Sequence, residues 1–229
     1  MAVYITGDIH RMTRRLTAFC EEHRLTQNDT IVLLGDVGAN YYLDQRDIPV
    51  KEALNKLGPQ VLCIHGNHEA RVCHLDSVRS KEWNGGAVYY EEDYPNLLYA
   101  KDGEVYRLLD YRCMAIGGAY SVDKEIRLLR GWQYFPDEQP DAEIKAYVEA
   151  QLKTHSVDVI FSHTCPARYT PFECFLPGID QRFVDSSTED WLNEIKERVD
   201  YKAWYCGHWH INKDIARVHF LFDGWKILV

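Results

Sequence analysis

Side chains that can bind a metal ion recur in short blocks along this chain. The blocks read GDIH, GD, GNHE, SH and GHWH, and their polar members are Asp8, His10, Asp36, Asn67, His68, Glu69, His163, His208 and His210. Carboxylates, an amide oxygen and imidazoles without a thiolate suit borderline divalent ions such as Mn, Fe, Ni, Co or Zn. The set contains too much nitrogen for a dedicated magnesium or calcium site. The set also contains more ligands than one tetrahedral ion can bind. Two metal ions roughly 3.5–4 Å apart form the clamp that proteins use for in-line attack on phosphorus.

Each block stands at the C-terminal end of a predicted buried strand. The strands, with a sixth at 113–118 that carries no block, are AVYITG (2–7), TIVLLG (30–35), QVLCIH (60–65), DVIFSH (158–163) and AWYCGH (203–208). Ligands of open α/β sheets bind outside the carboxyl ends of the strands. Each block alone is weak evidence for a binding site, but five blocks at the same sheet edge are strong evidence for one. Taken singly, Asp8 is equally explained as a helix N-cap, Asn67 as a turn residue and His163 as a core histidine.

Helical stretches alternate with the strands, at about 11–23, 47–57, 140–154 and 187–199, which predicts an α/β architecture. The last helix begins with a plausible capping box, Ser186 to Glu189. Residues 86–117 and the C-terminal segment with its DG turn favour antiparallel pieces, and hence a mixed sheet or two packed sheets. Without a repeat or a Ser/Gly-rich linker, residues 1–229 are expected to form a single domain.

Composition and charge narrow the function classes. The net charge of −9 argues against general nucleic-acid binding, which depends on Lys and Arg neutralising phosphates. No apolar run approaches the roughly 18–20 residues of a membrane span, so no membrane association is expected. The seven cysteines form no C-x-x-C pair, which with the missing signal peptide favours free thiols in a reducing cytoplasm.

The ordered blocks resemble the signature of the calcineurin-like metallophosphoesterases, from GDIH through GNHE and His163 to GHWH at residue 210. The resemblance implies two mixed β-sheets packed together with helices outside, a dinuclear metal site and hydrolysis of phosphate esters. It implies that one metal is held by Asp8, His10 and His210 and the other by Asn67, His163 and His208, with Asp36 bridging. His68 is then the general acid for the leaving group, and a metal-bound water or hydroxide is the nucleophile.

One block departs from the protein Ser/Thr phosphatase branch of this family. The chain reads GDVGAN, so Ala39 and Asn40 stand where an Asp-Arg pair is expected. A protein phosphatase is therefore disfavoured, and another group must orient His68. A nuclease or cyclic phosphodiesterase remains the alternative within the enzyme class, and a non-catalytic interaction module the alternative outside it, although such a module usually lacks part of the ligand set.

Substrate contacts are expected in the aromatic and arginine-bearing segment 117–140, a candidate substrate-covering loop. Arg127 or Arg130 is predicted to meet the phosphate, and Tyr120 or Trp132 to line the pocket. Arg71, close behind His68, is a further candidate, whereas His65 is interpreted as structural. The arginines are equally explained as solvated residues on a helix and the aromatics as packing.

The closing pair, His208 and His210, is expected to point to one side because residues i and i+2 of an extended segment do so. Gly207 would let the backbone approach the metals without a side chain in between. Trp209 is predicted to point away and pack, or to shield the site.

Overall fold

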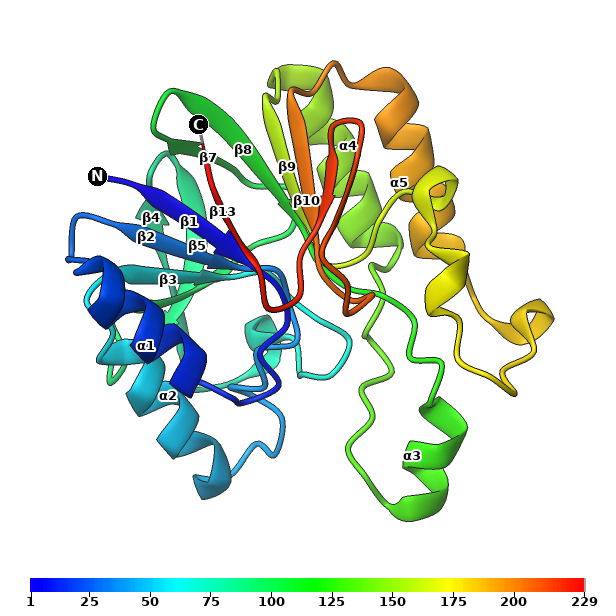
Figure 1. Ribbon diagram of the computed structural model, residues 1–229, viewed down its shortest axis with the longest axis horizontal. Helices are drawn as coiled ribbons and strands as arrows, with labels where there is room; N and C mark the ends of the chain where they lie inside the picture. Colours follow the sequence, from blue (N-terminus) through cyan, green and yellow to red (C-terminus); the bar gives the residue numbers. More distant parts are fainter. Residues whose placement is uncertain (229) are drawn as a thin grey trace.

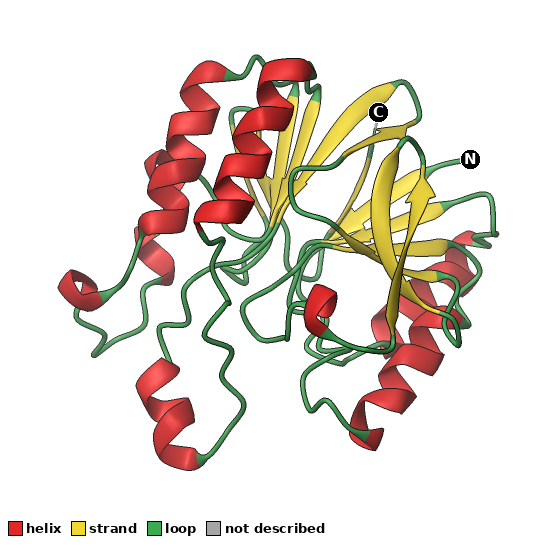
Figure 2. Ribbon diagram, turned by 180° about the vertical axis from the view of Figure 1, so that it is seen from behind, coloured by secondary structure: helices red, strands yellow, loops and turns green. Residues whose placement is uncertain are grey.

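Residues 1–228 are described by a computed structural model that contains two β-sheets. In the first sheet the strands lie in the order β13 (Trp225–Ile227), β1 (Val3–Thr6), β2 (Thr30–Leu33), β3 (Gln60–Cys63), β6 (Leu97–Ala100), β5 (Gly86–Glu91) and β4 (Val78–Trp83). In the second the order is β11 (Lys213–Ile215), β12 (Val218–Phe220), β10 (Ala203–Cys206), β9 (Val159–Ser162), β8 (Tyr111–Ile116) and β7 (Val105–Leu108). Figure 2 shows the two sheets from behind, with helices outside them.

Each sheet has a parallel centre and antiparallel edges. Strands β1, β2, β3 and β6 run parallel, with β13 and β5 antiparallel beside them. Strands β8, β9, β10 and β12 likewise run parallel, flanked by antiparallel β7 and β11. The prediction of two packed mixed sheets is confirmed. Because the central strands of a sheet are parallel, their carboxyl ends, and the loops that come after them, meet at one edge.

Four helices cover the outer faces of the sheets, as Figure 1 shows. Helices α1 (Arg14–His23) and α2 (Ile48–Asn55) lie against the first sheet. Helices α4 (Ala142–Thr154) and α5 (Ser187–Arg198) lie against the second. The result is the helix, sheet, sheet, helix sandwich expected from the strand and helix alternation. Within residues 1–228, no helix has the length and apolarity needed to cross a membrane.

Continuous apolar strands form because both faces of each sheet are covered. Successive residues of a strand point to opposite faces, so Val32 and Leu34 lie in the core between the sheets, whereas Ile31 and Leu33 pack outward against helix residues such as Leu16. Strands buried on both sides therefore carry unbroken runs of apolar residues. This is why the strand-end blocks stand out so clearly in the sequence.

The helix starts differ in part from the sequence predictions. Asp8 caps no helix, because α1 begins after Thr13, whose side chain makes no capping bond. The predicted capping box of α5 is also wrong: the Ser186 hydroxyl donates to Asp190 at 3.0 Å instead. Glu189 does not fold back to the N-cap because it is buried and accepts a 2.7 Å hydrogen bond from the hydroxyl of Thr164.

Segment 117–140 contains a helix that was expected to be a loop. Helix α3 spans Lys124–Arg130, ends at Gly131 with φ +64°, and projects away from the sheets (Figure 1). Asp123, the residue before the helix, forms an ion pair at 2.8 Å with Arg127 within it. With Leu128 and Leu129 exposed, it shows no apolar stripe that could have predicted a helix.

Replacing Phe161 with Ala is expected to destabilise the fold strongly. Phe161 is fully buried in the core between the sheets, so its loss leaves a cavity and costs about 3–5 kcal/mol. Urea unfolding followed by circular dichroism measures this change. Phe183→Ala is the matched control, because Phe183 is 79% exposed and its loss changes stability by no more than about 0.5 kcal/mol. Similar unfolding midpoints for the two variants would contradict the described core.

Candidate metal centre

The loops after five strands bring all the predicted ligands to one place, between the carboxyl ends of the two sheets. Asp8 and His10 follow β1, Asp36 follows β2, Asn67 and His68 follow β3, His163 follows β9, and His208 and His210 follow β10. The first three strands belong to one sheet and the last two to the other. The site therefore exists only where the two sheets meet.

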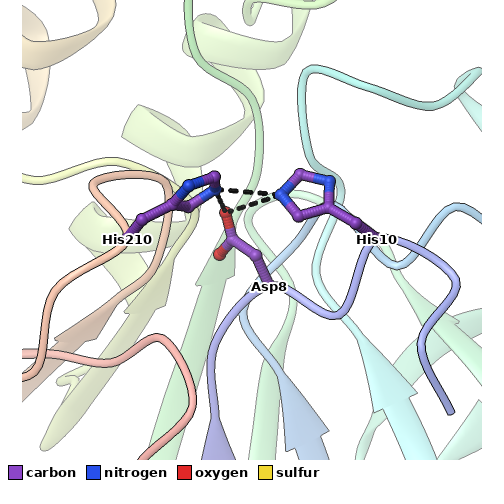
Figure 3. Close-up of side chains that lie close together, drawn as sticks. All are labelled: Asp8, His10 and His210. Carbon is purple, nitrogen blue, oxygen red and sulfur yellow. Dashed lines mark hydrogen bonds and ion pairs between the residues drawn. The ribbon is translucent and has the colours of Figure 1, made fainter. Parts of the chain in front are cut away.

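One cluster consists of Asp8, His10 and His210 (Figure 3). The Nε2 atoms of the two histidines lie 2.9 Å apart, and the Nε2 atom of His210 lies 3.3 Å from Asp8 Oδ2. This carboxylate oxygen is buried and has no hydrogen-bond partner in the described residues. The Asp8 carboxylate raises the pKa of His210 above its usual value, against the effect of burial. Two imidazole nitrogens and a bare carboxylate oxygen turned toward one another fit a divalent cation.

A second group of acceptors faces one point around Asn67. Its Oδ1 atom lies 2.8 Å from His163 Nε2 and 3.1 Å from His208 Nδ1. The other end of the amide donates to the Ser121 hydroxyl at 2.8 Å, which fixes the oxygen on the inner side. The Nδ1 atom of His163 donates to the carbonyl of Leu34 at 2.7 Å, which turns its Nε2 atom toward the amide oxygen. Burial lowers the pKa of His163, but the Asp36 and Asp8 carboxylates raise it above its usual value. A cation placed between these atoms would be bound by oxygen and nitrogen ligands that are already assembled.

Asp36 lies between the two groups. Its Oδ1 atom is 3.5 Å from His163 Nε2, and its Oδ2 atom is 4.0 Å from His10 Nε2 and 3.8 Å from His68 Nε2. Burial would raise the pKa of this carboxyl, but the surrounding imidazoles, His163 foremost, lower it below its usual value. Asp36 is therefore ionised and within reach of ligands from both groups, as a bridging carboxylate must be. The donor set of both groups fits two divalent ions.

Four of these residues have left-handed backbone conformations that only glycine adopts freely. The φ angles are +42° at His10, +48° at Asp36, +65° at His208 and +51° at His210. Such strain persists where the surrounding structure enforces it, and it concentrates at functional sites. The expectation that His208 and His210 form a same-side pair of an extended segment is wrong, because β10 ends at Cys206 and the chain turns before both residues.

Gly207 is required by close approach to Asp8. A Cβ atom at this position would lie 2.3 Å from Asp8 Oδ1, the atom that accepts a 2.9 Å hydrogen bond from the His208 amide. Gly207 thus makes room for the carboxylate, in line with its predicted role. Trp209 turns aside, with its indole N–H donating to Thr164 at 3.2 Å and its ring stacked on Phe175. Its packing role agrees with the sequence prediction.

His68 is held by groups that the sequence did not name. Its amide donates to Asp36 Oδ1 at 2.8 Å, and its Nε2 atom lies 3.2 Å from the guanidinium of Arg127. Burial lowers the pKa of His68, Asp36 opposes this shift, and Arg127 adds to it. Arg127 is in turn fixed by Asp123, whose two carboxylate oxygens each accept from its Nε atom at 2.8 Å. The i, i+4 spacing of Asp123 and Arg127 was the one signal for this pair in the sequence.

The other predicted substrate residues divide into one that reaches the site and three that do not. Tyr120 lines a cavity shared with Asp36 and His68. Arg71 is instead a buried structural residue that donates to Asp102 at 2.6 Å and to the Asp137 carbonyl at 2.8 Å.

Two further predictions in segment 117–140 are wrong. Arg130 is exposed and lies over the ring of Trp132, 4.9 Å from its centroid. Neither residue lines the cavity at the metal ligands. Both belong to the outward end of α3 and the turn after it, where nothing directs a side chain back to the strand ends.

Glu69, the last residue of GNHE, supports the site and was given no role by the sequence. Its two oxygens accept from the amides of Gly66 and Gly38, each at 3.0 Å, so it ties the loop after β3 to the loop after β2. Burial raises the pKa of Glu69 to about 7, the Asp36 charge adds to the shift, and the two amides oppose it. Its place within the GNHE block was the available signal.

The fold and these clusters define a metal-dependent hydrolase of phosphoesters. A family model described as calcineurin-like phosphoesterase matches residues 1–212, and the chain belongs to this family. Members of the family are dinuclear metal-dependent enzymes, and the chain contains Asp and His clusters that can bind metal. A comparison with curated proteins finds no match.

Two solved structures show the same fold. Phosphopantetheinyl hydrolase from Mycobacterium tuberculosis is 16% identical, with a TM-score of 0.57, and the match covers 96% of this chain and 88% of that one. The protein TT1561 of Thermus thermophilus is 10% identical, with a TM-score of 0.55 and the same two coverages, 96% and 88%. At these identities the similarity concerns the fold alone.

Replacing Glu69 with Gln is expected to change how the stability of the metal-free protein depends on pH. The pKa of Glu69 rises from its ordinary value of 4.5 to about 7 on folding. At pH values between these two, the folded protein retains a proton that the unfolded chain has released. Stability therefore falls as pH rises through this window, with a contribution of about 3 kcal/mol from this residue. Glu69→Gln removes that contribution, which urea unfolding at pH 4.5, 5.5 and 7 measures. The exposed Glu52, replaced in the same way, should leave the profile unchanged. Parallel profiles for all three proteins would contradict the assigned burial effect.

Proposed function

We propose that this chain is a dinuclear metal-dependent phosphoesterase acting on small phosphate esters. One ion is held by Asp8, His10 and His210, and the other by Asn67, His163 and His208, with Asp36 bridging. The observation that carries the proposal is the convergence of imidazole nitrogens, an amide oxygen and a carboxylate oxygen at 2.8–3.3 Å from one another, with the buried Oδ2 atom of Asp8 among them. Nitrogen and oxygen ligands gathered in this way suit borderline divalent ions.

Each group of the site then has a chemical task. Divalent ions held by these residues would supply an activated water as the nucleophile and positive charge to offset that of the phosphoryl oxygens. His68 donates a proton to the leaving-group oxygen. Burial lowers the pKa of His68 in the free site, and the Asp36 carboxylate, 3.8 Å away, opposes that shift. The Arg127 guanidinium donates to His68 Nε2 at 3.2 Å in the free site, so it must release this nitrogen before the nitrogen can carry the acidic proton, and it is then placed to contact the phosphate.

Several observations favour this function over its alternatives. The complete ligand set speaks against a non-catalytic module. Asn40 is buried and lacks the charge that an arginine would offer to a phosphoprotein, which disfavours a Ser/Thr protein phosphatase. The net charge of −9 disfavours a nuclease that binds long nucleic acids. The predicted cytoplasmic location is supported by the seven cysteines, all of which are unpaired in the described residues.

The proposal also takes residues 1–229 as one catalytic domain.

The function is tested by metal loading and turnover. The protein is stripped with a chelator, reloaded separately with Mn, Fe, Ni, Co or Zn, and assayed with p-nitrophenyl phosphate, a phosphodiester, cyclic nucleotides and a phosphopeptide. We expect two ions per chain and hydrolysis of a phosphomonoester only after reloading. The absence of bound transition metal together with the absence of hydrolysis would refute the proposal.

Replacing His208 or His210 with Ala is expected to empty different metal positions. His208 Nδ1 faces Asn67, whereas His210 Nε2 faces Asp8, so each variant retains one ion per chain and loses most activity. Elemental analysis after desalting gives the metal-to-protein ratio. His219→Ala is the control, because His219 pairs with Asp214 at 2.7 Å outside the site, and it should retain both ions. Full metal content in either site variant would argue against its role as a ligand.

Replacing His68 with Ala is expected to slow esters with poor leaving groups selectively. A general acid contributes about 100-fold to 10,000-fold when the leaving alkoxide needs a proton. Alkyl phosphates should therefore lose activity by that order, whereas p-nitrophenyl phosphate, whose leaving group is stable without a proton, should lose far less. The kcat for each ester is measured at full metal occupancy. An equal loss on both esters would show that His68 does not act as the acid.

A further inference from the structure

We propose that the leaving group of the natural substrate is apolar and carries no negative charge, and that it binds in a cavity beside the metal centre. This inference rests on the proposed phosphoesterase function and specifies its substrate class. The cavity has a volume of ≈ 580 Å³, within the range of small-molecule sites. Asp36, His68 and His210 are among its lining residues, and segment 167–190 supplies many of the others.

The position of the cavity relative to His68 decides which part of the substrate it holds. His68 and Tyr120 both line it, and His68 is the proposed proton donor to the leaving-group oxygen. A phosphoryl group at the metal ligands therefore directs its leaving group past His68 and into the cavity. The cavity is thus a leaving-group site rather than a second phosphate site.

Apolar side chains form a large part of the cavity lining outside the candidate metal ligands. They come mostly from one segment and include Phe172, Phe175, Leu176, Ile179 and Val184. Phe172 is 73% exposed and Leu176 55% exposed, although both border the same hollow. Single exposed apolar residues need no explanation. A contiguous group of them next to a reactive centre indicates a surface that a ligand covers.

The charges around the cavity exclude an anionic leaving group. No Lys or Arg is among its lining residues in the described part of the chain, whereas Asp123, Asp185, Glu189 and Asp190 are. The N-terminus of α5, which would attract an anion, is already occupied by Asp185, which accepts from the Ser187 amide at 2.9 Å.

Two arginines near the cavity are already paired with carboxylates. Arg127 is paired with Asp123, and Arg182, in the segment before α5, pairs with Asp180 at 2.5 Å. A second phosphate or a carboxylate on the leaving group would lie in a largely apolar site edged by negative charge, with no Lys or Arg among the lining residues of the described chain to compensate its desolvation. Polyphosphates and phosphorylated acids are therefore poor substrates on this geometry.

A homologous series of n-alkyl phosphates tests the proposal. With Mn-loaded protein, kcat/KM is expected to rise about threefold for each methylene from methyl to hexyl phosphate, because each buried methylene favours binding. Hexyl phosphate is also compared with 5-carboxypentyl phosphate, which is similar in length and ends in a carboxylate. We expect the charged ester to be worse by about tenfold or more. A flat alkyl series, or equal rates for the charged and uncharged esters, would overturn the proposal.

A charge placed in the cavity should reverse the preference. Leu176→Lys puts a cation on the apolar wall, so the ratio of kcat/KM for 5-carboxypentyl phosphate to that for hexyl phosphate should rise about tenfold. Leu129→Lys is the matched control, because Leu129 is 88% exposed on α3 and does not line the cavity. The same ratio in both variants and in the unmodified protein would refute a leaving-group site at this wall.

Binding of alkylphosphonates separates the two proposals. These analogues lack the scissile ester bond, so calorimetry with methylphosphonate and hexylphosphonate reports on the cavity without turnover. Tighter binding of hexylphosphonate with no hydrolysis of any ester would refute the phosphoesterase function and leave the apolar cavity site standing. Hydrolysis of all esters together with equal affinity for the two phosphonates would support the phosphoesterase function and refute the apolar leaving-group site. The exposure of Phe172 and Leu176 would then be explained by a protein partner or would have no role in binding.

Discussion

The structure depends on hydrogen bonds that cross the junction of the two sheets and hold buried polar groups together there. Asp8 comes from the first sheet, and its Oδ1 atom accepts a 2.9 Å hydrogen bond from the His208 amide at the end of the second. His163 makes the converse link, because its Nδ1 atom donates across the junction to the Leu34 carbonyl at 2.7 Å. These bonds direct the Oδ2 atom of Asp8 toward His210 and the Nε2 atom of His163 toward Asn67, into the space between the sheets. The core between the sheets thus fixes the distance between ligands of different sheets.

The backbone is adapted to the same junction at some cost. Left-handed conformations at His10, Asp36, His208 and His210 are unfavourable for side chains with a Cβ atom. They let the chain turn sharply after each strand and direct the side chain toward the centre. Such strain is tolerated where surrounding contacts impose it. The amides of Gly66 and Gly38, bound by Glu69, and the missing side chain at Gly207 provide part of that support.

Features that depend on strand ends could be predicted from the sequence, whereas features that depend on distant contacts mostly could not. The strands and the meeting of Asp8, Asn67 and His208 were predictable because buried strands have a clear apolar signature and parallel strands share an edge. Arg71 was misassigned because its partner Asp102 is far away in the sequence, and only the folded chain brings the two to 2.6 Å. Helix α3 was missed because its exposed apolar residues form no stripe.

The geometry of the final pair was wrong for another reason. A rule for extended segments was applied to residues that come after a strand, where φ becomes positive and alternation ceases to hold. The two histidines still converge on the site, but they face different partners, Asn67 for His208 and Asp8 for His210. Spacing could therefore indicate metal binding without indicating how the ligands divide between two ions.

Segment 117–140 connects the wall of the cavity to His68, which we propose as the proton donor. Asn40 stands where a charged residue is expected in related phosphatases, and the positive charge beside His68 comes instead from Arg127 on α3. Asp123 both lines the cavity and holds Arg127 with two 2.8 Å contacts. On the proposed mechanism, a leaving group that displaces Asp123 also displaces the guanidinium beside His68, because Asp123, Arg127 and His68 form one continuous hydrogen-bonded chain. Leaving-group selectivity and proton donation would then both depend on helix α3.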